Sequence, residues 1–293
     1  GEEAAYARWR LAEPEQLDRI HYRRRTNNWG YKPGNIREFC AAHGTNYDYL
    51  VLLDADSVMD GQTVSSLVTV MEHNPKLGIL QTLIVGILCP SSFARVFEFG
   101  HRLGLRCSIA GAAWWQVDRC QYWGHNAIIR LKPFIEFCEM PHLPGKGPFG
   151  GHILCHDQIE ASFIHRAGYE VRVLTQESGS YEGVPPTLID FLKRNHRWCR
   201  GNLKNLKLVG APGLKTIDRF HLAVVAQRFL AFPALAIFIV AAAAMACGHT
   251  QRPFAHNMAL ALLISWLAMF FAPRIFGIID ASRTSPEGYG GVR

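Results

Sequence analysis

The stretch YDYLVLLDADSVMD, residues 47–60, decides the fold that the sequence predicts. Its leucine-rich run at 49–53 predicts a buried strand, and this strand ends on Asp54 and Asp56. The carboxyl ends of strands border the ligand crevice of an open α/β sheet. Two carboxylates this close in an extended turn can reach one hard cation, which in turn can hold a diphosphate. Alternatively, one of the two aspartates caps a helix that begins near residue 62.

The residues that follow predict an α/β fold. Apolar positions spaced three and four apart predict a helix over 63–73, and Asn74 and Pro75 end it. A second strand is predicted at 76–85. The order strand, acidic turn, helix, strand predicts a mixed or mainly parallel sheet flanked by helices.

Composition limits the choice of partner and compartment. The 293 residues allow one large domain or one domain with an appendage, and the net charge is +7. The basic residues form no known nucleic-acid motif, so no nucleic-acid partner is expected. Eight cysteines without a C-x-x-C pair indicate reduced thiols facing the cytosol. His152, His156 and His165 follow no recognised metal spacing, so zinc is not expected.

The start of the chain is charged and polar, which does not match a signal peptide, and it has no initiating Met. We expect a piece of a longer protein, with a helix at 2–16 and an edge strand at 17–25. Asn35 is predicted to start a helix over 36–42 after a loop bearing glycine and proline. Lys32 in this loop either meets a phosphate at the helix N-terminus or is an exposed turn lysine.

Two segments in the middle carry polar groups beside loops. A helix is predicted at 90–112, and aromatic rings then lead to a small-residue loop, GHNA, at 124–127. These rings suit stacking on sugar faces, and they suit a hydrophobic core or a membrane interface as well. Asp157 precedes a helix predicted at 158–167, where the helix dipole favours its ionised form or where it serves as a cap. The aromatic residues are Trp114, Trp115, Tyr122 and Trp123.

The last part of the chain predicts membrane contact. After a strand at 170–174, the basic amphipathic helix at 187–207 can lie on an anionic membrane surface. Residues 229–247 carry no charge, and a second apolar run from 258 reaches 279 if Arg274 extends its charge to the interface. Basic residues before the first run place the globular part on the cytoplasmic side. A buried soluble hairpin is the alternative.

Four motifs in order, followed by apolar helices, resemble those of the processive family 2 glycosyltransferases, which include cellulose and hyaluronan synthases. The motifs are Asp54-Ala55-Asp56, Gly124-His125-Asn126, His156-Asp157 and Arg194-Asn195-His196-Arg197-Trp198. Within the family, RRRTNNWGYKPGNI, VLLDADSVM, CHDQIEASFIHRAGYEV and DFLKRNHRWCRGNLKN are similar to the bacterial glucosyltransferases that build osmoregulated periplasmic glucans. The resemblance runs from about residue 22 onward.

The resemblance implies a fold and an organisation. It implies a GT-A-type, Rossmann-like catalytic domain, then an interfacial helix and a transmembrane hairpin. The predicted regions are 1–186 for the cytoplasmic catalytic domain, 187–220 for the interfacial region, 221–281 for the hairpin and 282–293 for a cytoplasmic tail. The whole protein would be a multi-pass protein of the bacterial inner membrane.

The resemblance also implies a reaction. Glucose would pass with inversion from UDP-glucose to a growing β-glucan, and Asp157 would be the general base. Mg²⁺ or Mn²⁺ would be held at Asp56, the direct ligand, with Asp54. Donor contacts are implied for Lys32, Asn35, Asp54, Asp56 and Arg197, and acceptor contacts for Gly124, His125, Asn126 and Trp198. The bilayer and other glucan-synthesis proteins are the further expected partners.

Three departures from the family pattern bear on this reading. Arg194 stands where Gln is usual, and His156 stands where Glu is common. Nothing before Leu17 resembles the family's earlier strand, which contacts uracil, so activity is expected to need segments outside this chain. The alternatives are another family 2 polysaccharide synthase and a non-catalytic membrane module that senses nucleotide sugars.

Overall fold

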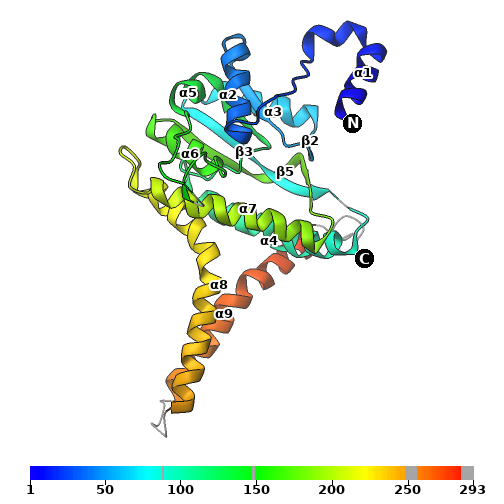
Figure 1. The fold of residues 1–293 in the computed structure, drawn as a ribbon. Coiled ribbons are helices and arrows are strands. Elements are labelled where there is room, and N and C mark those ends of the chain that lie inside the picture. The colour runs from blue at the N-terminus through cyan, green and yellow to red at the C-terminus, as the bar shows by residue number, and fades with distance from the viewer. Residues whose placement is uncertain (88, 147–148, 249–255, 285–293) are drawn as a thin grey trace.

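The computed structural model describes residues 1–87, 89–146, 149–248 and 256–284 (Figure 1). An α/β body forms the upper part, and two long helices extend below it. The helices are α1 (Glu2–Ala12), α2 (Tyr31–His43), α3 (Gly61–His73), α4 (Ser92–Gln116), α5 (Leu131–Phe137), α6 (Asp157–Arg166), α7 (Leu188–Asn205), α8 (Thr216–Gly248) and α9 (His256–Thr284). The strands are β1 (Tyr49–Leu52), β2 (Ser57–Met59), β3 (Leu77–Ile87), β4 (Ala127–Arg130) and β5 (Glu170–Gly183).

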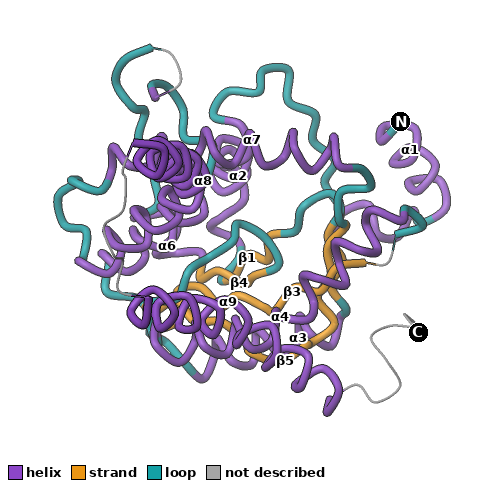
Figure 2. Tube along the Cα trace, turned by 90° about the horizontal axis from the view of Figure 1, so that it is seen from below, coloured by secondary structure: helices purple, strands orange, loops and turns teal. Residues whose placement is uncertain are grey.

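The described strands form one sheet in the order β1-β4-β3-β5-β2, which lies at the centre with helices around it (Figure 2). β4 is antiparallel to both β1 and β3, so β1 and β3 run in the same direction without touching. β5 is parallel to β3, and β2 is antiparallel to β5. The prediction of a mixed α/β sheet is therefore confirmed. The sheet is not mainly parallel, because β4 lies between β1 and β3 and is antiparallel to both, and β2 is antiparallel to β5.

The acidic turn follows β1 as predicted, and the next helix packs on the sheet. α3 buries Leu67 and Met71 against residues of β3 and β4. The cap of α3 is Asp60, whose carboxylate accepts a hydrogen bond of 2.6 Å from the Thr63 N–H. Asp54 and Asp56 are therefore not needed as caps of this helix, and the alternative reading of the motif is wrong.

The N-terminal region differs from the prediction. The edge strand predicted at 17–25 is wrong: a short 3₁₀ helix covers Pro14–Arg19, and the residues after it run without strand pairing. The side chains of this segment contact the neighbouring helix instead. Arg25 forms an ion pair of 2.6 Å with Glu38 of α2. α2 begins at Tyr31, not at 36, because Gly30 takes the left-handed conformation that starts it (φ 68°). Lys32 and Asn35 therefore lie inside the helix.

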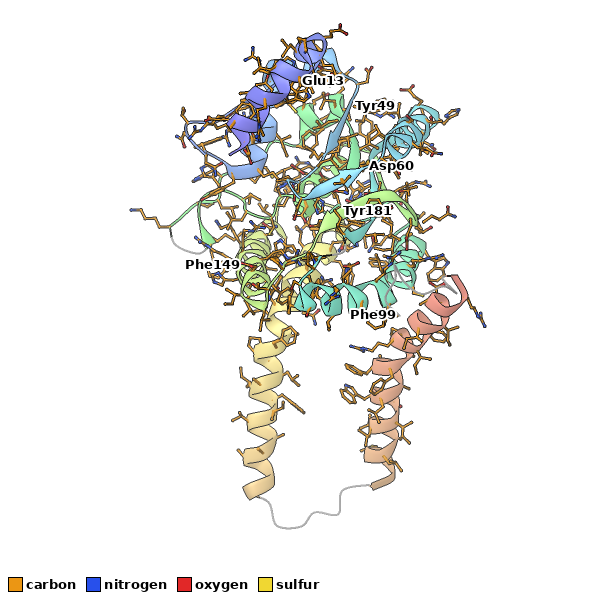
Figure 3. The ribbon with its side chains drawn as sticks, turned by 90° about the vertical axis from the view of Figure 1, so that its right-hand side faces the viewer. Glu13, Tyr49, Asp60, Phe99, Phe149 and Tyr181 are labelled. Atoms are coloured by element: carbon orange, nitrogen blue, oxygen red, sulfur yellow. The ribbon has the colours of Figure 1, made fainter. Side chains whose placement is uncertain are left out.

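The C-terminal helices extend from the body. α8 and α9 include the spans Thr216–Ala244 and Leu260–Ala281, which are long and apolar enough to cross a membrane. Figure 3 shows the two helices extending from the body with side chains projecting on several sides, and few residues of either span are buried. The buried-hairpin alternative is therefore not supported. Residues 249–255 of the predicted loop and residues 285–293 of the predicted tail lie outside the described residues.

Close packing ties α9 to the body. A side chain at Gly277 would come within 2.2 Å of the Leu103 carbonyl oxygen of α4, so only glycine permits this approach. α4 in turn contacts α7, where the Phe97 and Phe191 rings lie 5.3 Å apart. The helix predicted at 187–207 is confirmed as α7, and it lies at the end of the body from which α8 emerges (Figure 1).

Candidate active site

Lys32 joins three segments at the carboxyl end of β1, the place where an α/β sheet is expected to have its ligand crevice. Its ammonium group forms an ion pair with Asp54 and donates a hydrogen bond of 2.8 Å to the Gly124 carbonyl oxygen. Three segments far apart in sequence, α2, the acidic turn and the loop before β4, therefore meet at one cation. The structure places Asn35 differently, because its side-chain oxygen accepts a hydrogen bond from Arg23.

Asp56 lies on the exposed side of the turn, against the end of β5. The Gly183 N–H donates a hydrogen bond of 2.8 Å to the Asp56 carbonyl oxygen, and a Cβ on Gly183 would lie 3.0 Å from that of Asp56. The register pairs Ser57 with Glu182. Burial raises the pKa of Glu182, His125 and Arg194 lower it, and the nearby charges of Asp56 and Asp54 raise it further. Three carboxylates therefore border this side of the crevice.

Glu182 was not predicted as a site residue. The available signal was its place directly before the Gly-Val-Pro-Pro segment, where a strand must end. The predicted strand stopped at 174, whereas β5 continues to Gly183 because it pairs with β3 over most of its length and with β2 near its end. This pairing carries Glu182 to the acidic turn.

The Gly124-His125-Asn126 motif forms a tight connection into β4. Asn126 is buried with a left-handed backbone (φ 50°), and its amide donates to Ser180 Oγ at 2.8 Å and the Tyr181 carbonyl oxygen at 3.0 Å. These bonds make the Asn126 side chain a support for the loop. His125 Nδ1 lies 2.9 Å from Asn126 Oδ1, and its Nε2 lies 3.7 Å from Glu182.

Asp157 is the first residue of α6, and it faces the same loop. A Cβ on Gly124 would lie 3.4 Å from that of Asp157, so the missing side chain leaves room beside the carboxylate. Burial raises the pKa of Asp157, while His156, backbone N–H groups at the helix start and Lys32 lower it. The net shift is upward. A carboxylate with a raised pKa suits the acceptance of a proton.

α7 brings the fourth motif, Arg194 to Trp198, to the acidic side of the candidate site. The Arg194 guanidinium stacks over the Trp198 ring at 4.6 Å, and the Trp198 side chain is 39% exposed. Burial lowers the pKa of Arg194, the charges of Glu182 and Asp56 raise it, and Arg197 lowers it. Arg194 therefore lies where it compensates the acidic side of the crevice. A neutral Gln at this position would not supply that charge.

α7 also holds the loop that precedes Asp157. The buried Lys204 ammonium donates to the carbonyl oxygens of Gly150 at 2.7 Å and His152 at 2.9 Å. Asn205 donates to the Cys155 carbonyl oxygen at 2.7 Å. Burial raises the pKa of the Cys155 thiol to about 12, so this cysteine stays protonated and serves packing. The position of Asp157 therefore depends on α7.

Gly201→Ala should test this dependence. A Cβ at Gly201 would lie 2.3 Å from the Cys155 sulfur, so the loop has to shift. We expect a loss of about 1 to 3 kcal/mol of stability, typical of overpacking. Thermal unfolding in detergent measures it. The matched control is Gly100→Ala in α4, where a Cβ meets nothing within 4 Å. The control should gain about 0.5 to 1 kcal/mol of helix propensity, and equal midpoints for the two variants would contradict the packing argument.

The aromatic residues considered for sugar stacking mostly serve packing or lie away from the loop. Tyr122 is fully buried in the main core, and Trp123 packs against the cluster of β3 and α4. Trp115 of α4 lies edge-on to His221 of α8, and Trp114 is 84% exposed. The core alternative holds for Tyr122 and Trp123, and Trp198 is the ring that borders the candidate site.

The acidic turn and the end of β5 carry carboxylate groups, which are the ligands that Mg²⁺ prefers in proteins. Asp54, Asp56 and Glu182 supply hard carboxylate oxygens of the kind that a divalent cation binds. No group of three His, Cys, Asp or Glu side chains within the described ranges is arranged to hold an ion by itself. Diphosphate oxygens and water would have to complete the set, as is usual for Mg²⁺. The three histidines considered for zinc lie in separate environments.

Comparisons with known proteins agree with the fold and with the order of the motifs described above. The family model described as Glycosyl transferase family 2 matches residues 7–137, and that described as Glycosyl transferase family group 2 matches residues 158–274. A glucans biosynthesis glucosyltransferase H of Klebsiella pneumoniae subsp. pneumoniae is 38% identical over 96% of this chain and 35% of the relative. Proteins of the same name from Dickeya dadantii and Vibrio cholerae serotype O1 are each 38% identical, over 94% and 89% of this chain and 34% and 38% of the relative.

The chain thus spans about a third of the length of these curated relatives. The two family models together span the acidic turn, nearly all of α6, and the whole of α7 and α8. Because two models of this family match successive parts of the chain and these relatives align along most of it, the chain belongs to glycosyltransferase family 2.

Proposed function

We propose that this chain is the catalytic part of a membrane-bound inverting glucosyltransferase that moves glucose from UDP-glucose to a growing β-glucan. The observation that carries the proposal is the meeting of Asp157, Lys32 and Asp54 around Gly124, beside the Arg194 to Trp198 motif of α7. The relatives' printed name, glucans biosynthesis glucosyltransferase H, supports glucose as the sugar and a glucan as the product.

The donor diphosphate would bind at the acidic turn. Lys32 offers an ammonium group there, and Arg197 offers a guanidinium that can bind phosphate oxygens with two hydrogen bonds. Mg²⁺ or Mn²⁺ at Asp56 and Asp54, when bound, would neutralise charge on the departing diphosphate. Lys32 already compensates Asp54, so Asp56 is the carboxylate left free to bind.

The acceptor would approach from the Asp157 side. Asp157 would take the proton of the acceptor hydroxyl while that oxygen attacks the anomeric carbon, and the carbon–oxygen bond to the diphosphate breaks. A single displacement of this kind inverts the configuration of the sugar. The exposed face of Trp198 can stack on an acceptor sugar, and Arg194 fixes the opposite face of the ring.

The apolar helices support a membrane location. α8 follows α7 through a short connection, so a glucan chain leaving the crevice would meet the helices at once. We propose the bacterial inner membrane, with the α/β body on the cytoplasmic side and further spans elsewhere in the whole protein. Association with other glucan-synthesis proteins belongs to this proposal.

The test is transfer of labelled glucose from UDP-glucose by membrane vesicles containing the complete protein. We expect polymer-bound label with Mg²⁺, loss of incorporation after chelation with EDTA, and recovery on adding Mn²⁺. UDP-N-acetylglucosamine and UDP-glucuronic acid serve as competing donors. Incorporation from one of these in place of UDP-glucose would point to another family 2 synthase. Nucleotide-sugar binding without any transfer would point to a sensing module.

A further inference from the structure

A buried ion pair joins α6, the helix that begins with Asp157, to α8. His165 lies in the last turn of α6, and Asp218 lies in the first turn of α8. The His165 Nδ1 lies 2.5 Å from a carboxylate oxygen of Asp218, and both side chains are 1% exposed. The pair is therefore a directional polar contact between the helix of the proposed base and the helix that extends from the body as the first apolar span.

The surroundings of the pair argue against a role in stability alone. His221, one turn further along α8, is 4% exposed and lies edge-on to Trp115 of α4. Three buried atoms, His165 Nε2, Asp218 Oδ2 and His221 Nε2, have no hydrogen-bond partner among the described residues. A buried ion pair with unsatisfied polar atoms stabilises a protein less than apolar side chains of similar size would. A contact that served only packing would be made better by such apolar side chains.

α6 connects the pair to the proposed base. Asp157 is the first residue of this helix of 10 residues, and His165 lies eight positions later, about 12 Å along the helix axis. Because backbone hydrogen bonds hold successive turns together, a displacement of the last turn is carried to the first. The place of Asp157 therefore depends on what holds His165.

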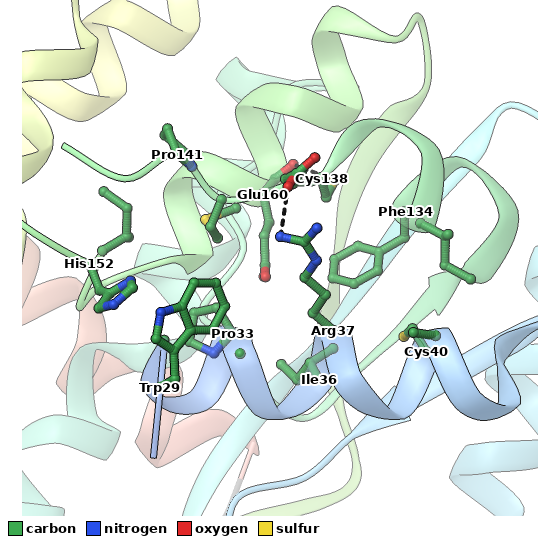
Figure 4. A pocket seen from close by; sticks show the side chains of 17 residues that line it. Trp29, Pro33, Ile36, Arg37, Cys40, Phe134, Cys138, Pro141, His152 and Glu160 are labelled. Carbon is green, nitrogen blue, oxygen red and sulfur yellow. Dashed lines mark hydrogen bonds and ion pairs between the residues drawn. The ribbon is translucent and has the colours of Figure 1, made fainter. Parts of the chain in front are cut away.

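Packing leaves the first turn of α6 room on one side. A cavity of about 260 Å³ lies between α2, the segment after α5 and α6, and Glu160 of the first turn is part of its wall. Figure 4 shows the Glu160 carboxylate pointing toward α2, between Trp29 and Arg37. Its other close contact is with His156, whose Nδ1 lies 2.8 Å away. Since close packing is what normally fixes a helix, the cavity increases the importance of the contact at the far end of α6.

We propose that His165 and Asp218 position Asp157 for proton transfer by fixing α6 to the start of α8. The inference rests on the proposed function above. α7 holds the loop before Asp157 through Lys204 and Asn205, and the ion pair holds the opposite end of α6, so the base is held from both sides. Both members of the pair are positioning residues, because they act through α6 and lie outside the candidate site.

A double replacement separates positioning from stability. His165→Leu combined with Asp218→Leu removes the directional contact and leaves apolar groups, a change that is often neutral or stabilising at a buried ion pair. In vesicles containing the complete protein, we expect kcat for glucose transfer to fall about 10²-fold, the cost of misplacing a reacting group by about 1 Å. The KM of UDP-glucose should stay at the wild-type value, because the donor contacts lie on other elements. The midpoint of thermal unfolding in detergent should not fall.

Two single variants of His165 give an independent readout. His165→Asn carries an amide nitrogen at the position of Nδ1, so it can still donate a hydrogen bond to Asp218. His165→Gln carries the same amide one bond further out, at the position of Nε2. We expect His165→Asn to keep a kcat close to wild type and His165→Gln to be clearly slower, again with an unchanged KM for the donor.

The matched control is a second ion pair that joins two elements without involving α6. Arg102 of α4 and Glu177 of β5 form an ion pair of 3.1 Å, and both are partly buried. Arg102→Leu combined with Glu177→Leu should keep the wild-type kcat. A fall equal to that of the double variant at His165 and Asp218 would overturn the specific role of that pair.

The outcomes separate the two proposals. A wild-type protein that transfers no sugar overturns the proposed function and the positioning role together. A wild-type protein that transfers sugar, with a folded and equally fast double variant at His165 and Asp218, overturns the positioning role alone. If that double variant does not fold, the two single variants decide, and equal kcat values for His165→Asn and His165→Gln overturn the positioning role.

Discussion

Replacing Asp157 with Asn should lower the rate of glucose transfer by about 10² to 10⁴, the range for loss of a general base, and leave UDP-glucose binding intact. The amide keeps the size and the hydrogen bonding of the side chain but cannot take the proton of the acceptor hydroxyl. Donor contacts come from the acidic turn, Lys32 and α7, so they remain. Labelled incorporation in vesicles measures the rate, and equilibrium binding of labelled UDP-glucose measures the affinity.

The matched control is Asp190→Asn. Asp190 lies in the first turn of α7, so it has the same relation to a helix dipole, but its carboxylate pairs with Thr187 and Lys193 outside the crevice. Transfer by this control should equal wild type. If Asp157→Asn also incorporates at the wild-type rate, Asp157 is only a helix-end residue and the base assignment is wrong.

The raised pKa of Asp157 adds a pH dependence to this prediction. The base works only when ionised, and burial makes ionisation harder than for an ordinary aspartate. The wild-type rate should therefore fall as pH drops through the pKa of Asp157, at a pH above that of a solvated carboxylate. Asp157→Asn should lose this dependence along with most of its activity.

The elements predicted from sequence are those with strong local signals. β1 with its acidic turn, α3, α7 and the two apolar helices each follow from a run or a periodicity of apolar residues within one segment. The pairing of Lys32 with Asp54 and Gly124 agrees with the motif-based assignment of Lys32 and Asp54 to one site. These elements are present in the structure because the apolar residues that predict each element also form its contacts with the rest of the protein.

Features that depend on distant segments were not predictable. The polar stretch of β5 from 175 to 183 becomes a strand only because β3 and β2 supply partners, and this is what places Glu182 beside Asp56. The early start of α2 depends on the left-handed Gly30, and Arg25 of the preceding segment holds the Trp29 and Tyr31 carbonyl oxygens. The spacing of His156 and Glu160 was visible in the sequence, but only burial shows that they pair.

Replacing Asp56 with Asn should have the second large effect. Asp54 is already compensated by Lys32, whereas Asp56 is exposed at the mouth of the crevice, with Glu182 beside it. Loss of its charge should weaken Mg²⁺ binding and lower the transfer rate by about 10²-fold or more. This corresponds to about 3 kcal/mol of the several kcal/mol that a bound cation supplies to charge stabilisation.

The measurement is the transfer rate as a function of Mg²⁺ concentration. Asp56→Asn should need much more Mg²⁺ for half its maximal rate, and UDP-glucose binding should lose its dependence on the ion. Asp60→Asn is the matched control four residues later, because Asp60 caps α3 and Asn caps a helix about equally well. The control should respond to Mg²⁺ as wild type does. If Asp56→Asn does the same, the cation is held elsewhere, and Asp56 serves only to keep Arg194 in place through its charge.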